Sequence, residues 1–351
     1  MLYLLSLLSG DFGPFRLFDY VTFRAGGAAL TAFLLVVLLG GFTARQLRRL
    51  NAQAASRLEG LVPPEFIDKE KNRTPCMGGI LLIGAILVTA LLWNVMTNPI
   101  SITLVVATAA FSLIGFVDDF MKVVYKRRDG IPGRAKLAGQ FLVAGLAVWS
   151  LSRIPELQTL MRQLMVPFLK EPVYTGFWTL PFAVVVIVGA SNAVNLTDGI
   201  DGLAASVTLP VAIFFVFVGF RRGDMGVVIF SAALAGALLG FLRYNFNPAK
   251  VFMGDTGSLF LGGAVAGLAF ACEMPLILLL VGLIYIIETL SVILQVTYFK
   301  ATHGKRLFKM APIHHHFEMC GWGEKKIVLV FTGITVVLCL LAYHVALAPL
   351  F

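Results

Sequence analysis

The sequence predicts an all-α protein that crosses a membrane about ten times, and three observations support this prediction. Of its 351 residues, 58% are hydrophobic and only 13% are charged. The mean hydropathy of +0.88 exceeds what the core of a water-soluble protein requires. The lysines and arginines fall in short segments between long apolar runs. Membrane topology therefore explains the net charge of +9 better than a nucleic-acid-binding face does.

Ten apolar runs are candidates for the membrane-spanning helices. They are residues 21–42, 77–93, 100–117, 137–151, 177–195, 204–220, 225–242, 259–271, 276–298 and 327–348. The fourth and eighth runs are short and contain glycine, so we expect them to be tilted, broken or buried among their neighbours. No segment between the runs is long enough for a soluble domain, and we therefore expect one membrane domain over residues 1–351.

The charges of the loops predict the orientation. The segments after the odd-numbered runs carry 21 Lys and Arg, whereas the opposite side carries 6. The positive-inside rule then places the odd-numbered loops in the cytoplasm and both termini on the outer, periplasmic side. The polar clusters described below all fall in these loops, as does the basic segment 69–73. The sequence therefore predicts an active site formed by several cytoplasmic loops.

Two adjacent aspartates, Asp118 and Asp119, lie where the third apolar run ends, and Lys122 follows them. A charge at the centre of a bilayer costs about 2.5–3.5 kcal/mol on insertion scales, so acids at the end of a membrane helix indicate a function. The alternative is a solvated helix end.

A second polar cluster has a spacing of three residues, with Asn192, Asn195, Asp198 and Asp201 in line. In a helix this spacing forms one polar stripe that drifts by about 60° over nine residues. Such a stripe can face a nucleotide or a cation. The alternative is a helix end rich in Asp, Asn and Gly.

A third cluster runs from Asn245 to Ser258, where Asn247-Pro248 favours a turn and residues 254–258 precede an apolar run. A helix that begins here would offer free backbone N–H groups to a phosphate. Asp255 could hold the hard cation that accompanies a phosphate. Simple N-capping is the alternative.

A fourth cluster contains three consecutive histidines, His314, His315 and His316. Successive side chains of a helix turn by about 100°, so the three imidazoles cannot easily share one zinc ion. They suit donors or proton carriers around a phosphate. The nearby lysines and arginine between residues 300 and 309 attract anions, although a solvated charged loop is the alternative.

Together the clusters supply carboxylates for Mg²⁺ and lysines and histidines for phosphate oxygens. Cation-assisted phosphoryl transfer is the reaction class that this set serves, because its barrier falls mainly through positioning and charge neutralisation. A site at the membrane surface implies one lipid substrate, and the other should be a soluble nucleotide.

Five motifs resemble the phospho-N-acetylmuramoyl-pentapeptide transferase family, within the polyprenyl-phosphate N-acetylhexosamine-1-phosphate transferase superfamily. They are Thr74-Pro75-Cys76-Met77-Gly78-Gly79, Asp118-Asp119 with Lys122, and residues 195–202, 252–258 and 312–318. The resemblance covers nearly the whole chain from about Phe66 onward. One departure is Cys76, where the family pattern usually has threonine, and it puts one hydrogen bond near the nucleotide in doubt.

The resemblance implies transfer of phospho-MurNAc-pentapeptide from its UDP carrier to undecaprenyl phosphate, which gives lipid I and UMP in peptidoglycan synthesis. It implies Mg²⁺ as cofactor, a homodimer and the bacterial inner membrane, and no nucleic acid as partner. The alternative is a related transferase that acts on UDP-GlcNAc, which should lack the histidine motif. A transporter is the alternative that is not an enzyme, but it should carry its ionisable residues near the middle of the bilayer.

The resemblance also implies roles for individual residues. Asp118, Asp119 and Asp255 form the catalytic set, in which Asp255 ligates Mg²⁺ and Asp118 is the candidate base. Phe252 is expected to stack on uracil. The other substrate-binding residues implied are Lys71, Lys122, Lys126, Asn195, Asp198, Asp201, Asn245, His314, His315 and His316. Direct attack by the lipid phosphate is favoured, and a phospho-enzyme intermediate is the alternative.

The ninth apolar run is long and carries Glu288 and Gln295, which lie seven residues apart and near one helical face. This pattern predicts a helix that tilts, or that breaks and leaves the membrane, and so opens an apolar groove for the lipid beside the aspartate pair. The alternative is a tilted helix that buries Glu288 against its neighbours.

Overall fold

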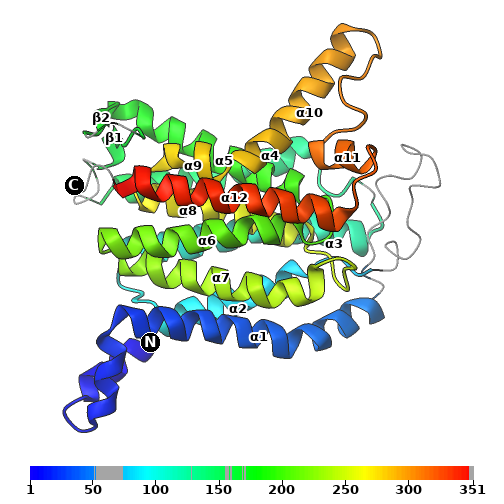
Figure 1. Ribbon diagram of the computed structural model, residues 1–351. Helices are drawn as coiled ribbons and strands as arrows, with labels where there is room; N and C mark the ends of the chain where they lie inside the picture. Colours follow the sequence, from blue (N-terminus) through cyan, green and yellow to red (C-terminus); the bar gives the residue numbers. More distant parts are fainter. Residues whose placement is uncertain are drawn as a thin grey trace.

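A computed structural model of the chain describes residues 1–50, 52, 74–127, 129–154, 158, 160–167, 169 and 171–347. Its long helices lie side by side in a bundle (Figure 1). The α-helices are α1 Val21–Arg49, α2 Gly79–Trp93, α3 Pro99–Val123, α4 Gly133–Ser152, α5 Thr179–Thr197, α6 Leu203–Arg222, α7 Met225–Asn245, α8 Gly254–Ala271, α9 Leu278–Val281, α10 Leu283–Ala301, α11 Ile313–Glu318 and α12 Glu324–Leu347. Two short strands, β1 Gln163–Leu164 and β2 Val173–Tyr174, pair antiparallel between α4 and α5.

Nine of the ten predicted apolar runs each coincide with one helix, and the ninth run is divided between α9 and α10. Eight helices of the described part of the chain are long and apolar enough to cross a membrane, and α2 is a shorter apolar helix. The all-α, multi-pass membrane class predicted from composition is therefore confirmed. The count of ten crossings stays a prediction.

The centre of the bundle depends on close contacts between backbones. A Cβ at Gly236 of α7 would overlap the carbonyl of Ala29 in α1, and a Cβ at Gly262 of α8 would lie 2.5 Å from the carbonyl oxygen of Ala190 in α5. Small residues at such crossings let membrane helices approach closely. Helices α7 and α8 therefore form the buried middle, and α1 and α5 pack on them.

Another glycine sets the distance between α3 and α8. A Cβ at Gly115 of α3 would overlap the backbone of Asp255, at the start of α8. Only glycine leaves room for this approach. The contact places the carboxyl-terminal end of α3, which carries the aspartate pair, beside the first turn of α8.

The ninth apolar run is not one continuous helix. Helix α9 ends at Val281, α10 begins at Leu283, and Gly282 lies between them. Figure 1 shows α10 leaving the bundle at an angle, so the predicted break is confirmed. Glu288 is nonetheless buried, as the alternative proposed. The lipid groove itself stays a prediction.

The second polar residue of this run holds a loop against α10. The Gln295 side chain accepts hydrogen bonds from the backbone N–H groups of Leu307 and Phe308 at 3.1 and 2.8 Å, and it donates one to the Phe308 carbonyl at 3.2 Å. The segment that leads to the histidine motif therefore follows α10.

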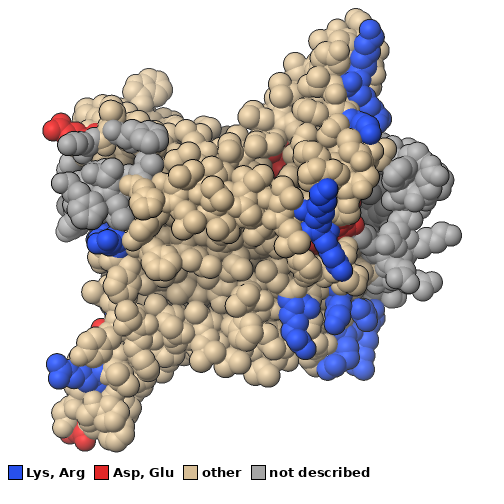
Figure 2. Space-filling model, viewed as in Figure 1, with Lys and Arg blue, Asp and Glu red and all other residues tan. Residues whose placement is uncertain are grey.

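The first residues of α1 and the last residues of α12 lie at the same end of the bundle (Figure 1). Most lysines and arginines visible in Figure 2 gather at the opposite end, along the outer part of α10, the start of α12 and the end of α1. This arrangement agrees with the bias in loop charge. Which face is cytoplasmic stays a prediction.

Candidate active site

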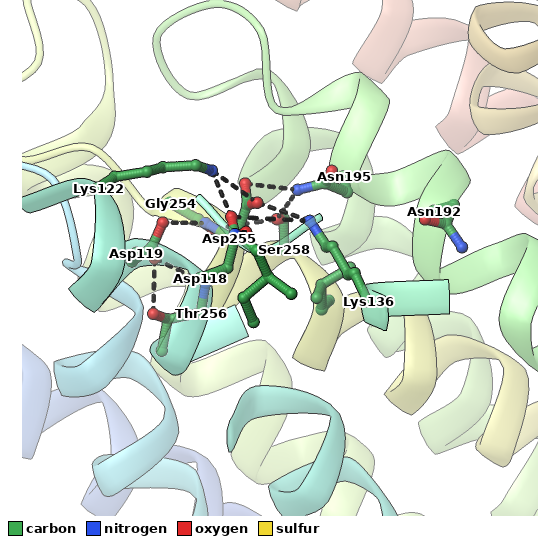
Figure 3. Close-up of polar contacts among 12 residues, drawn as sticks. Asp118, Asp119, Lys122, Lys136, Asn192, Asn195, Gly254, Asp255, Thr256 and Ser258 are labelled. Atoms are coloured by element: carbon green, nitrogen blue, oxygen red, sulfur yellow. Dashed lines mark hydrogen bonds and ion pairs between the residues drawn. The ribbon is translucent and has the colours of Figure 1, made fainter. Parts of the chain in front are cut away.

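Asp255, in the first turn of α8, is the centre of a buried ionic cluster. One carboxylate oxygen, Oδ2, accepts hydrogen bonds from Lys122 Nζ at 2.9 Å and from Lys136 Nζ at 2.6 Å. The other, Oδ1, accepts one from Asn195 Nδ2 at 2.9 Å. Figure 3 shows the two lysines reaching Asp255 from opposite sides, from the end of α3 and the start of α4. Three helices thus converge on this carboxylate, which confirms that separate polar clusters meet.

Asp118 lies beside the same lysines. Its Oδ2 forms an ion pair with Lys122 and lies 3.9 Å from Lys136 Nζ. Its Oδ1 accepts a hydrogen bond from the backbone N–H of Ile131 at 2.8 Å, which holds the loop after α3. Asp118 and Asp255 therefore share one lysine. The cluster of Asp118, Asp255, Lys122 and Lys136 is called the ionic cluster below.

Asp119 has a different environment, because it caps the amino-terminal end of α8. Its Oδ1 accepts from the backbone N–H of Asp255 at 3.1 Å, and its Oδ2 accepts from the backbone N–H of Thr256 at 2.8 Å and its hydroxyl at 2.6 Å. The prediction that these N–H groups are free for a phosphate is therefore wrong, since an aspartate from α3 already satisfies them. Asp119 holds Asp255 in position.

This cap requires glycine at the residue before Asp255. Gly254 has φ +75°, and a Cβ there would lie 2.6 Å from Asp119 Oδ2 and 2.9 Å from Cys76 Sγ. A side chain would therefore be strained by its backbone conformation and would also push Asp119 away.

We expect Gly254→Ala to lower the rate of the transfer that the resemblance implies about 100-fold, because a displacement of about 1 Å near the chemistry has that effect. Initial rates of the implied product, UMP, measure it. Gly133→Ala is the matched control, since a Cβ at Gly133 meets nothing within 4 Å. Equal rates for the two variants would contradict the role of Gly254.

The predicted polar stripe on α5 is shorter than its spacing suggested. Helix α5 ends at Thr197, so only the two asparagines share its face, and Asp198 is the cap residue. Asn192 pairs with Gln140 of α4, with Nδ2 2.6 Å from Oε1. Figure 3 shows Asn192 apart from the cluster around Asp255. The stripe prediction is therefore wrong beyond Asn195, because glycines after Asp198 end the helix.

Asp201 lies in the turn between α5 and α6 and holds a neighbouring loop. Its Oδ2 accepts from Asn247 Nδ2 at 3.2 Å and from the backbone N–H of Ala249 at 2.9 Å. Glu324, at the start of α12, accepts from the same Asn247 at 3.1 Å. These contacts join three connections at one end of the bundle, so in them Asp201 has a structural role.

The segment from Asn245 to Phe252 is held by backbone contacts. Asn245 is buried and donates a hydrogen bond to the Val251 carbonyl at 3.0 Å. Phe252 is half-buried, its N–H donates to the Pro75 carbonyl at 2.8 Å, and its carbonyl accepts from Gly78 at 2.8 Å. The first motif therefore lies directly along the loop that carries Phe252, while Asn245 shapes that loop from within.

The three histidines make up half of the short helix α11 and have separate partners. His314 is fully buried, with Nδ1 2.9 Å from Oε2 of the equally buried Glu288. His315 Nδ1 lies 2.5 Å from Glu318 Oε2, and His316 Nδ1 accepts from the N–H of Lys309 at 3.1 Å. The His314 ring also packs against Gly199, where a Cβ would overlap its Nε2. The structure thus places the histidine motif beside the turn after α5, at Gly199, four residues after Asn195.

Of two further predicted lysines, one is not part of these contacts and the other is not among the residues that the structure describes. Lys126 is exposed in the loop after α3, with φ +51°. Lys71 lies outside the described residues, as does the basic segment 69–73. Their roles toward substrate stay predictions.

The acidic side chains fit a hard divalent cation. Within the described residues, Asp118, Asp119 and Asp255 offer carboxylate oxygens that all lie within 4.8 Å of one another. Carboxylate oxygens are the ligands that Mg²⁺ prefers. The donors to Asp119 belong to the first turn of α8, whereas the Oδ2 atoms of Asp118 and Asp255 are paired with flexible lysine side chains. Asp118 and Asp255 can therefore exchange a partner for a cation more readily than Asp119 can.

Comparisons with known proteins agree with this chemistry. A family model described as glycosyl transferase family 4 matches residues 101–273. A Clostridium botulinum protein (strain Alaska E43 / Type E3) named phospho-N-acetylmuramoyl-pentapeptide-transferase is 44% identical over 317 residues, which cover 90% of this chain and 94% of that protein. The chain belongs to the phospho-N-acetylmuramoyl-pentapeptide-transferase family.

Further relatives of the same name come from other bacteria. A Maridesulfovibrio salexigens protein is 42% identical over 353 residues, 95% of this chain and 96% of its own length. A Ruegeria pomeroyi protein is 43% identical over 358 residues, 97% of this chain and 98% of its own length. The resemblance inferred from five motifs is therefore confirmed over nearly the whole chain of this transferase.

Sequence reasoning missed several residues of the transferase site. Lys136 lies 14 residues after Lys122 in the same basic loop, and that position was the only available signal. Ser258 accepts a hydrogen bond from Asn195 Nδ2 at 2.8 Å and donates one to the Gly254 carbonyl at 3.0 Å. The sequence predicts Glu288 either beside a lipid groove or buried against neighbouring helices, and it gives no sign that Glu288 is the partner of His314. Such pairings between distant helices leave no trace in local spacing.

Cys76 stands where the family pattern usually has threonine, and the reactivity of its thiol tests the environment in which the structure places it. Burial, reinforced by the nearby negative charge of Asp119, raises the pKa of the Cys76 thiol well above its usual value. A raised pKa lowers the thiolate fraction at neutral pH, and the thiolate is the reactive form.

We expect a water-soluble maleimide at pH 7 to modify the exposed Cys320 at least ~100-fold faster than Cys76. Mass spectrometry of the labelled peptides over time measures the ratio, and unfolding in detergent should abolish the difference. Equal labelling of both cysteines in the folded protein would contradict the buried position of Cys76.

Proposed function

We propose that the chain transfers phospho-MurNAc-pentapeptide from UDP-MurNAc-pentapeptide to undecaprenyl phosphate, and that it forms lipid I and UMP in peptidoglycan synthesis. The observation that carries this proposal is the position of the ionic cluster at the end of an apolar helical bundle. The chain that contains it is a member of this transferase family. Two buried carboxylates and two lysines there match a reaction in which a diphosphate is cleaved and a phosphate attacks.

The positions of the binding residues support the two substrates. Phe252 is half-buried on a loop beside the start of α8, where its ring can stack on uracil. Lys122 and Lys136 reach the ionic cluster from two helices and suit the diphosphate oxygens. The lipid would reach the cluster along α10, whose exposed face carries Ile287, Leu290, Ile293 and Leu294.

We propose Mg²⁺ as the cofactor, held by Asp255, with Asp118 beside it as the candidate base. When bound, the ion neutralises charge on the diphosphate oxygens during transfer. Asn195 orients Asp255 through Oδ1, and the Asp119 cap fixes the backbone of Asp255, so the chain presents this carboxylate in one orientation.

We favour direct attack by the lipid phosphate, with Asp118 as the group that accepts its proton. Support comes from the carboxylates themselves. Asp119 is bound by three donors of α8, and Asp255 is bound by two lysines and Asn195. A carboxylate that is paired in this way is a poor nucleophile, because its charge is already stabilised.

We further propose that the enzyme is a homodimer in the bacterial inner membrane, with its active site toward the cytoplasm. The loop-charge bias of 21 to 6 supports this orientation.

The decisive experiment incubates the purified protein with UDP-MurNAc-pentapeptide, undecaprenyl phosphate and Mg²⁺. We expect UMP and lipid I in equal amounts, and neither product when the ion is chelated. UDP-GlcNAc in place of the muramoyl nucleotide tests the related specificity, and its preferential use would overturn the proposal. A burst of UMP without any lipid would contradict direct attack and would support a covalent phospho-enzyme intermediate.

A further inference from the structure

We infer that Lys136 and the catalytic cation compete for one oxygen, Asp255 Oδ2, and that a bound cation transfers Lys136 from Asp255 to the substrate diphosphate. The inference rests on the proposed Mg²⁺ site and assigns a role to a lysine that the sequence did not single out.

The contacts of the two lysines differ. Lys122 binds both carboxylates of the ionic cluster, since it pairs with Asp118 and lies 2.9 Å from Asp255 Oδ2. Lys136 lies 2.6 Å from Asp255 Oδ2 but 3.9 Å from Asp118 Oδ2. Lys136 is therefore held mainly by Asp255 Oδ2. If another cation takes this oxygen, Lys136 has no second partner at an equally short distance.

That oxygen is also the one that a cation needs. Asp255 Oδ1 already accepts the hydrogen bond from Asn195, so Oδ2 is the oxygen directed at the ionic cluster. An ammonium and a divalent cation on one oxygen repel each other strongly, because the site is buried and poorly screened. Lys122 keeps its ion pair with Asp118 when the cation takes this oxygen, so binding of the cation opposes the Lys136 contact most directly.

The released ammonium has a suitable destination. Lys136 lies in the first turn of α4, its side chain is 15% exposed against 9% for Lys122, and its four-carbon stem is flexible. Phosphate oxygens that ligate the cation would lie next to it. Without a cation, Lys136 neutralises Asp255. With a cation, it binds the diphosphate, so that charge in the cluster stays balanced at each stage.

The test measures binding and not turnover. Mn²⁺ affinity of the purified full-length protein, without nucleotide, is measured by electron paramagnetic resonance for the wild type, Lys136→Met and Lys136→Arg. We expect Lys136→Met to bind Mn²⁺ about tenfold more tightly, because a competing positive charge is gone. Lys136→Arg, which keeps the charge, should remain near the wild type.

Arg134→Met is the matched control. Arg134 lies in the same turn of α4 and is exposed, so this variant removes one positive charge without altering the cluster. It should leave the Mn²⁺ affinity within about twofold of the wild type. Calorimetry with UDP and Mg²⁺ completes the test, and Lys136→Met should bind UDP more weakly than Arg134→Met does.

An unchanged or weaker Mn²⁺ affinity in Lys136→Met would overturn the inference, even if UDP binding fell, since Lys136 would then be an ordinary phosphate contact. Equal tightening in Arg134→Met would overturn it too, because the effect would be one of net charge. Neither measurement requires lipid or transfer. If the transfer assay failed while Mn²⁺ tightened as expected, the proposed function would fall and the competition would stand.

Discussion

Replacing Asp255 with asparagine is expected to lower the rate of transfer by about 10³-fold or more, because one change removes the carboxylate that two lysines and Asn195 share. The amide is nearly the same size as the carboxylate, so the loss would be one of charge and not of packing. Steady-state UMP release with saturating substrates measures the effect. Mn²⁺ binding should weaken in parallel, because a neutral amide oxygen attracts a divalent cation less strongly than a carboxylate does.

Asp129→Asn is the matched control for this variant. Asp129 is an exposed aspartate in the loop between α3 and α4, so its neutralisation alters net charge to the same extent. We expect its rate to stay within about twofold of the wild type. A rate for Asp255→Asn within tenfold of the rate of this control would contradict a catalytic role for Asp255.

Replacing Asp119 with alanine is expected to affect folding as well as activity. The change would leave two backbone N–H groups and the Thr256 hydroxyl without their acceptor in a buried position. Each buried donor left without a partner costs about 1–3 kcal/mol, and loss of a helix cap costs about 0.5–2 kcal/mol. We therefore expect a clear drop in the thermal midpoint in detergent, together with nearly complete loss of transfer.

Two further variants separate the cap from a chemical role of Asp119. Asp119→Asn keeps one carbonyl acceptor and should recover much of the thermal midpoint. Asp255→Asn keeps the cap, because the backbone of Asp255 still donates to Asp119, so any fall in its midpoint reflects the lost ion pairs with Lys122 and Lys136 and not the cap. If Asp119→Ala were as stable as the wild type but inactive, Asp119 would act in the reaction and not as a cap.

The sequence predicted the helical bundle well, because apolar runs long enough to cross a membrane are a property of local composition. It also placed Asp118, Asn195 and Asp255 in one site, since a common membrane face limits where polar loops can meet. The break in the ninth run followed from its length and its two polar residues. These predictions needed no knowledge of how the helices pack.

Other features depend on packing between distant segments and could not be predicted. The capping of α8 by Asp119 joins residues 136 positions apart. The length of α5 depended on whether the glycines after Asp198 continue or end a helix, and spacing alone favoured the wrong choice. The role of Lys136 follows from its contact with Asp255, which depends on how the start of α4 lies near the first turn of α8. The class of reaction was therefore easier to predict than which of several similar side chains has which role.

The position of α10 has one more consequence. Glu288 binds the imidazole of His314, and Gln295 binds the backbone of Leu307 and Phe308. Both anchors lie on α10, and together they hold the segment 307–314, whose His314 ring packs against Gly199 in the turn after α5. A displacement of α10 would therefore move the histidine segment and press on this turn at the same time.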